Sequence, residues 1–146
     1  KINRDLSFVN KDFVGEVYSY LNLVNNEIYK KNFLASSIYN AVMTMWDNTP
    51  RRNNHGNVIF HGASPALYKK WLSDIILHYK KDCSLDDDFI FLNALNAWNE
   101  WGEGAYPEPD RYYGYALEAT KDAIEEMRRK IEGGLMINKK DWNCNS

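Results

Sequence analysis

The pattern of hydrophobic and polar positions alternates along the chain between segments typical of strands and segments typical of helices. Four segments are predicted as strands: residues 12–18, 37–46, 57–60 and 89–95. Three helices are predicted with one apolar face each, formed by Leu21, Val24 and Ile28, by Leu67, Trp71, Leu72, Ile75, Ile76 and Tyr79, and by Leu117, Thr120, Ile124, Met127 and Ile131. Strands that alternate with helices predict an α/β fold, with a parallel sheet covered by helices.

Local signals predict where these elements begin and end. Ser64 before Pro65 is typical of a helix N-cap, and a Gly pair at residues 133–134 ends the last helix, so residues 134–146 are expected to be a frayed tail. A complete (β/α)₈ barrel takes about 250 residues. Residues 1–146 are therefore predicted to be one partial domain, the C-terminal βα units of such a TIM barrel. The start at Lys1, without an initiator Met, favours a piece of a longer protein.

Composition narrows the function classes. The formal net charge is −2 and the Lys and Arg residues are scattered, so nucleic-acid binding has no support. No apolar run approaches the ~20 residues of a membrane span, and no signal peptide is recognisable. Cys83 and Cys144 lack a metal-ligand spacing, as do His55, His61 and His78, so we expect no metal and no other cofactor. A reducing, cytoplasmic compartment is the resulting expectation.

Residues 96–110, NAWNEWGEGAYPEPD, carry the densest candidate chemistry and follow the last predicted strand. Catalytic side chains of α/β proteins gather at the carboxyl ends of parallel strands, which makes Glu100 and Glu103 candidate catalytic carboxylates. Residues three apart on a strand face opposite ways. The two carboxylates therefore converge only if the chain leaves the strand between them, which Gly102 and Gly104 permit.

Polar and aromatic residues at the same predicted rim are candidates for sugar binding: Trp46, Asp47, Asn48, Asn99, Trp101 and Glu108. Tryptophan faces stack on sugars, and polar side chains bind the hydroxyl groups. Several of these residues fit structural roles equally well. Asp47 and Asn48 fit an Asx turn that ends a strand, and Glu108, between two prolines, fits a residue that holds its loop. Arg51 and Arg52 are predicted to be a solvated loop pair rather than a phosphate or acidic-sugar site.

The segment NAWNEWGEG, followed by EPD at residues 108–110, YGY at 113–115 and LEA at 117–119, resembles the C-terminal signature of the WbsX-type family. Members of that family are described as glycosyltransferases of bacterial polysaccharide loci. The segment MWDNTPRR and the helix that follows Ser64 also resemble its preceding units, so the resemblance covers about residues 18–131.

The chain is similar, more distantly, to glycoside hydrolase family 99, the endo-α-mannosidase type, whose TIM barrel carries an Asn-Glu-Trp-x-Glu-Gly motif. This resemblance implies that Glu100 assists the 2-hydroxyl of the substrate and that Glu103 is the general acid/base. Gly102 stands where those hydrolases usually have His.

The sequence therefore predicts a carbohydrate-active, glycosidase-like enzyme domain that uses a Glu pair. The favoured function is a glycosyltransferase of bacterial surface polysaccharide or lipopolysaccharide biosynthesis. The alternatives are a glycoside hydrolase of the endo-α-mannosidase type and a non-catalytic carbohydrate-binding or structural domain. Without its partner strands the chain is expected to be inactive, and to self-associate through exposed barrel edges or repack them. We also expect residues 46–48 and 99–103 at the same edge of one parallel sheet.

Overall fold

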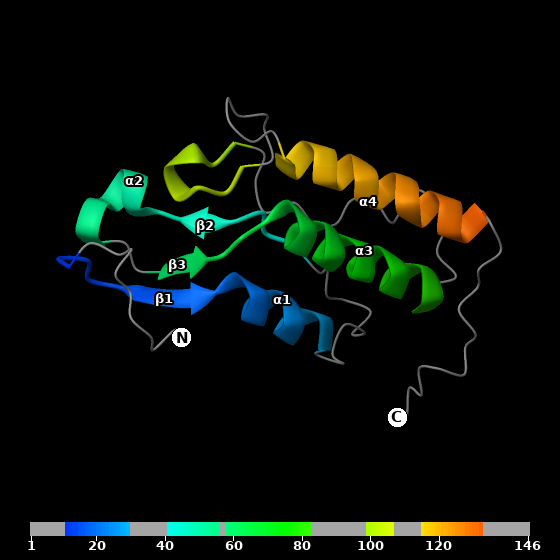
Figure 1. Cartoon of the computed structure of the whole chain (residues 1–146), viewed down its shortest axis with the longest axis horizontal. Coiled ribbons are helices and arrows are strands. Elements are labelled where there is room, and N and C mark those ends of the chain that lie inside the picture. The colour runs from blue at the N-terminus through cyan, green and yellow to red at the C-terminus, as the bar shows by residue number, and fades with distance from the viewer. Residues whose placement is uncertain (1–10, 30–40, 56–57, 83–98, 107–114, 133–146) are drawn as a thin grey trace.

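The computed structural model describes residues 11–29, 41–55, 58–82, 99–106 and 115–132 (Figure 1). Several sequence predictions lie outside the described residues: the strand at residues 89–95, the helix stop at residues 133–134, the tail at residues 134–146, Glu108, Cys83 and Cys144. The same holds for the side chains of Ile28, His78, Tyr79 and Ile131. That residues 1–146 form a single domain stays a prediction.

The described part of the chain is a mixed α/β fold with a small three-stranded sheet, in the order β1 (Glu16–Ser19), β3 (Val58–His61) and β2 (Trp46–Asp47). β1 runs parallel to β3, with Val17 opposite Ile59. β2 runs antiparallel to β3, so the prediction of a purely parallel sheet is wrong for this strand. Parallel neighbours need a crossover of about a dozen residues or more. Residues 48–55 instead turn the chain back through α2 (Thr49–Arg52) and the 3₁₀ turn Asn53–His55.

The long helices begin where the sequence predicts them. In α1 (Tyr20–Tyr29), the Ser19 hydroxyl oxygen accepts a hydrogen bond from the Asn22 backbone N–H at 3.2 Å. In α3 (Pro65–Asp82), the Ser64 hydroxyl oxygen accepts from the Leu67 N–H at 3.3 Å. Each serine satisfies an N–H group that has no partner inside the first helical turn. The predicted Ser64 N-cap is confirmed.

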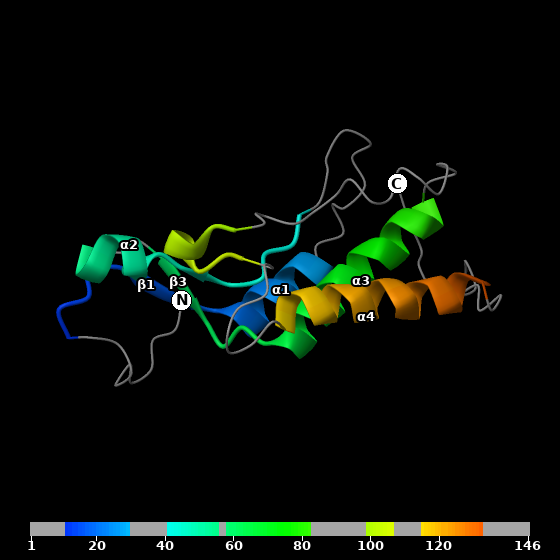
Figure 2. The same ribbon diagram turned by 90° about the horizontal axis from the view of Figure 1, so that it is seen from above.

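The helices pack against one another rather than over the sheet. α3 lies between α1 and α4 (Tyr115–Glu132), and both views show this helical layer beyond the carboxyl ends of β1 and β3 (Figures 1 and 2). The expectation that helices cover the sheet is therefore wrong for the described elements. α1 begins at the residue directly after β1, so no loop is present to turn the helix back over the strands.

The hydrophobic core lies between these helices and the end of the sheet. Tyr20 is fully buried and meets Trp71 edge-on, with ring centroids 6.2 Å apart. The rest of the buried cluster consists of Val24, Val42, Tyr68, Leu72, Ile75, Ala119 and Ala123. Leu21, predicted on the inner face of α1, is 48% exposed, and Tyr20 takes its place.

α4 packs on α3 through small residues that the predicted apolar face did not include, Ala119 and Ala123, and Ala116 is buried as well. Of the predicted face, Met127 is buried, Thr120 and Ile124 are half-buried, and Leu117 is exposed. Alanine side chains let two helix axes approach closely, which rotates the contact face of α4 away from Leu117. The helix is confirmed, but its inner face is shifted.

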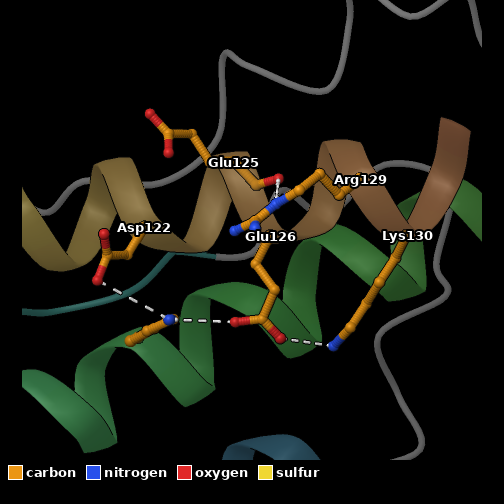
Figure 3. A network of polar contacts seen from close by, with 6 residues as sticks. Asp122, Glu125, Glu126, Arg129 and Lys130 are labelled. Carbon is orange, nitrogen blue, oxygen red and sulfur yellow. Dashed lines mark hydrogen bonds and ion pairs between the residues drawn. The ribbon is translucent and has the colours of Figure 1, made fainter. Parts of the chain in front are cut away.

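The outer side of the α3–α4 contact carries a network of ion pairs (Figure 3). The Lys69 ammonium lies 3.1 Å from a Glu126 carboxylate oxygen, and Lys130 contacts the other oxygen at 2.6 Å. Hydrogen bonds from Lys130 and then Lys69 hold the pKa of the Glu126 carboxyl below its ordinary value. Because these groups face solvent, the network ties the helices together only weakly.

Candidate active site

The two candidate catalytic glutamates lie in one tight turn. The 3₁₀ turn η3 (Trp101–Glu103) closes through a hydrogen bond of 3.1 Å from the Glu103 N–H to the Glu100 carbonyl oxygen. The Ala105 N–H donates to the same carbonyl oxygen, also at 3.1 Å. Gly104 ends the turn in a left-handed conformation, φ 63°. The chain between Glu100 and Glu103 is thus a turn and not a strand. Leaving the strand conformation is the condition under which the two side chains can converge.

The turn rests directly on the end of β2. A Cβ placed on Gly104 would lie 3.2 Å from both the backbone nitrogen and the backbone oxygen of Asp47, so only a glycine allows this approach without a shift. Residues 46–48 and 99–103 are therefore neighbours, but the prediction that they lie at the same edge of one parallel sheet is wrong in its parallel-sheet part. The reason differs from the expected one, because β2 is antiparallel to β3 and the contact is between a turn and a strand end.

Arg51 joins α2 to η3. Its Nη2 group donates to Oε1 of Glu103, a partner 52 residues away in the sequence. The Glu103 side chain is 16% exposed and that of Arg51 54%. The aliphatic part of Arg51 lies over the turn, with its Cδ 3.5 Å from the position of a Cβ on Gly102. Arg51 is therefore not a purely solvated loop residue, and the sequence contained no spacing signal that pairs it with Glu103.

Glu100 and Asn99 are exposed at the mouth of the turn. The Asn99 carbonyl oxygen accepts a hydrogen bond from the Trp101 N–H at 2.9 Å, which helps to start the turn. Within the described residues, the Glu100 carboxylate has neither a hydrogen bond nor an ion pair. The two glutamates thus share a turn but differ in environment, because only Glu103 is tied to a cation.

Trp101 forms an aromatic surface beside the carboxylates. Its ring stacks on Tyr106 with centroids 3.8 Å apart and ring planes inclined by 19°, while 45% of Trp101 stays exposed. An exposed tryptophan held by a second ring is a stiff apolar surface of the kind on which sugar rings stack. Trp46, the other aromatic candidate, is half-buried in β2 opposite Phe60.

Asp47 and Asn48 have largely structural contacts. Oδ1 of Asp47 accepts from the Thr49 N–H at 2.9 Å and from the Thr49 hydroxyl at 2.7 Å, so the Asx-turn interpretation is confirmed for this oxygen. Asn48 is only 6% exposed, and its Oδ1 has no hydrogen-bond partner in the part of the chain described. The backbone carbonyl oxygen of Asn48 accepts hydrogen bonds from the backbone N–H groups of Arg51 and Arg52, at 3.2 and 3.0 Å.

Comparison with known proteins decides the family. The sequence model of the family described as "Glycosyltransferase WbsX" matches residues 1–120. The chain belongs to the WbsX glycosyltransferase family. Two similar proteins, each bearing the name "Uncharacterized protein WxcX", come from Xanthomonas campestris pv. campestris, strains B100 and ATCC 33913. Each is 38% identical over 117 residues, which is 80% of this chain but 16% of the relative. No solved structure matches this WbsX-family chain.

Two further properties of the WbsX-family chain concern other kinds of site. Over the ranges described, His, Cys, Asp and Glu side chains form no group of three or more that would hold a metal ion. Among the helices described, none has the length and apolar character needed to cross a membrane. His55 and His61 are exposed.

Proposed function

We propose that this domain supplies part of the sugar-binding and catalytic site of a glycosyltransferase that acts in bacterial surface polysaccharide or lipopolysaccharide biosynthesis. One observation carries the proposal: a single turn of a WbsX-family chain presents Glu100 and Glu103 beside an exposed, stacked Trp101. The carbohydrate is the substrate. Cytoplasmic location, a TIM-barrel origin of the domain, inactivity of this chain alone and its self-association are further parts of the proposal.

The chemistry needs two different carboxyl groups. In enzymes that act on glycosidic bonds through a carboxyl pair, one group transfers a proton to or from the oxygen at the bond, and the other stabilises the oxocarbenium-like sugar. The resemblance to glycoside hydrolase family 99 assigns proton transfer to Glu103 and assistance of the 2-hydroxyl to Glu100. Trp101 is proposed to stack on the sugar, with Trp46 and Asn99 as additional contacts.

The remaining proposed contacts differ in how much of each side chain is free. Asp47 uses Oδ1 in its turn, and Oδ2, which has no hydrogen bond to the described residues, is proposed to bind a sugar hydroxyl. Asn48 would have to become exposed to reach substrate, because its side chain is buried. Glu108 belongs to the proposal from the sequence. Since the chain spans 16% of the relatives that it matches, the rest of the active site is proposed to come from the remainder of a longer protein.

The experiment uses the full-length protein that contains this chain. It is incubated with a panel of nucleoside-diphosphate sugars and aryl-glycoside acceptors, and the products are analysed by mass spectrometry. A product heavier by one sugar residue identifies transfer, and free sugar identifies hydrolysis. Glu100→Gln and Glu103→Gln keep the shape of each side chain but remove its acid–base function, so each is expected to lower turnover by ~10²-fold or more.

The same variants show whether the measured activity comes from this domain or from another part of the long protein. Near-normal turnover by both variants would mean that the glutamates are not catalytic. The exposed Trp101–Tyr106 stack would then favour the second candidate, a carbohydrate-binding domain. In that case the variants should bind sugars as the unmodified protein does, and Trp101→Ala should not. Free sugar in the absence of transfer would favour the hydrolase alternative.

A further inference from the structure

Arg51 is the cation that contacts the candidate catalytic pair within the described residues, and it contacts Glu103 alone. The bond uses Nη2 of Arg51 and Oε1 of Glu103, and in the described part of the chain Oε2 of Glu103 has no hydrogen bond. A guanidinium presents its donors in a rigid, planar fork. An arginine therefore fixes the direction of a carboxylate better than a lysine does.

The backbone on the Arg51 side of the contact is ordered by its own hydrogen bonds. Oδ1 of Asp47 accepts a hydrogen bond from the Thr49 backbone N–H at 2.9 Å. The backbone carbonyl oxygen of Asn48 accepts one from the Arg51 N–H at 3.2 Å. These bonds lie within residues 47–51 and order the start of α2 at the end of β2. The base of the Arg51 side chain is thus in place whether or not Glu103 is engaged.

The backbone on the Glu103 side is also held independently. The bond from the Glu103 N–H to Glu100 closes the turn, and Gly104 seats the turn against Asp47. Gly102 leaves room for the Arg51 stem to lie over the turn. Because both backbones are ordered already, forming the ion pair requires only the two side chains to lose conformational freedom.

We propose that Arg51 is the positioning residue for Glu103. It holds Oε1 and thereby directs Oε2 of the same carboxylate toward the sugar, an inference that rests on the proposed catalytic role of Glu103. Catalytic groups must be held within about 0.5 Å of the productive geometry. A glutamate side chain in a turn would otherwise sample several rotamers, only some of which reach the substrate. The arginine compensates for the placement of Glu103 in a turn rather than on a rigid strand.

The test is made in the full-length protein with the transfer assay described above, with kcat and KM measured separately. Arg51→Ala should lower kcat by about tenfold to a hundredfold, the effect of a small misplacement of a catalytic group, with a smaller change in KM. Guanidinium chloride, at concentrations far below those that unfold proteins, should restore part of the lost kcat. Arg52→Ala is the matched control, because Arg52 is the exposed residue that follows Arg51 on α2. This variant should leave kcat unchanged.

Two more variants decide whether Arg51 acts through Glu103. In a Glu103→Gln background, Arg51→Ala should cause little further loss, because the group that it positions is already disabled. Arg51→Lys keeps a cation and an aliphatic stem over Gly102, so it carries the test if Arg51→Ala folds poorly. It should keep a normal thermal unfolding midpoint while losing most of the kcat.

Three outcomes would overturn the inference. Equal losses from Arg51→Ala in both backgrounds would mean that Arg51 acts directly on substrate. A damaging Glu103→Gln with an unaffected Arg51→Ala would refute the positioning role alone. Normal turnover of Glu103→Gln itself would refute the proposed function, and the positioning role with it.

Discussion

Gly104 lies against the backbone of Asp47 in a left-handed conformation, and this contact joins the glutamate-bearing turn to the end of β2. A Cβ at Gly104 would be 3.2 Å from both the nitrogen and the oxygen of Asp47. Gly62 shares the left-handed conformation, with φ 83°, but a Cβ there would meet nothing within 4 Å. The two glycines therefore separate the cost of the conformation from the cost of the contact.

Gly104→Ala is expected to destabilise the protein more than Gly62→Ala does. Gly62→Ala should cost about 1 kcal/mol, because a side chain disfavours the left-handed region. Gly104→Ala should add ~1–3 kcal/mol, because the turn must move away from the peptide of Asp47. Urea unfolding of the two variants measures the difference. Equal costs would show that the turn leaves Asp47 without penalty, and that the junction does not hold the glutamates in place.

Trp101→Ala is expected to weaken sugar binding with little effect on stability, because almost half of Trp101 is exposed. A stacking contact worth about 1.4 kcal/mol corresponds to a tenfold loss of affinity. Glycan-array binding by the full-length protein, followed by titration of a sugar that binds, measures this loss. Leu21→Ala is the matched control, because Leu21 is 48% exposed but lies on α1. Equal binding by both variants would remove Trp101 from the site.

The Tyr68–Thr120 contact between α3 and α4 predicts an asymmetry between two substitutions. The Thr120 hydroxyl donates to the Ala116 carbonyl oxygen at 2.7 Å, so its oxygen accepts from the Tyr68 hydroxyl at 2.9 Å. Tyr68→Phe removes the donor and leaves no buried group unpaired, and it should cost about 1 kcal/mol. Thr120→Val leaves the fully buried Tyr68 hydroxyl without its acceptor, and it should cost more, ~1–3 kcal/mol.

Denaturant unfolding of both variants measures this asymmetry. The double variant provides the control, because removing donor and acceptor together should cost less than the sum of the single losses. Additive losses would show that the hydroxyl groups do not interact, and that the contact contributes packing alone.

The burial of Tyr68 predicts a loss of stability in alkali. Burial raises the pKa of its hydroxyl above the ordinary value, because the apolar surroundings disfavour the charged phenolate. The folded state therefore keeps the proton at a pH where the unfolded chain releases it, near pH ~10. This contribution to stability is complete below that pH and is lost as the pH rises through the folded-state pKa.

The free energy of unfolding of the unmodified protein should thus fall more steeply above pH ~10 than that of Tyr68→Phe. Chemical unfolding at a series of pH values from neutral to alkaline compares the two proteins. Because both share all other titrating groups, the difference between their curves isolates Tyr68. Parallel curves would show that the hydroxyl titrates alike in the folded and unfolded chains.

Features that depend on near neighbours in the chain followed from the sequence. The Ser64 cap, the Asx turn at Asp47 and the turn that Gly104 ends all close within a few residues. The helices α1, α3 and α4 were predicted from periodicity for the same reason. Their inner faces were less predictable, because the packing partner decides which residues are buried. On α1, Tyr20 is buried and Leu21 is exposed, and on α4, Ala119 and Ala123 belong to the cluster packed on α3.

The family, the glutamate motif and the alternation of strands and helices were thus readable from the order of residues alone, because each is a property of sequence or of short-range hydrogen bonding. Tertiary structure alone decided that β2 runs antiparallel to β3. It also decided that Arg51 meets Glu103 and that Tyr68 meets Thr120, two contacts that each span 52 residues. No rule based on sequence spacing predicts such pairs, because the path of the intervening chain determines which side chains meet.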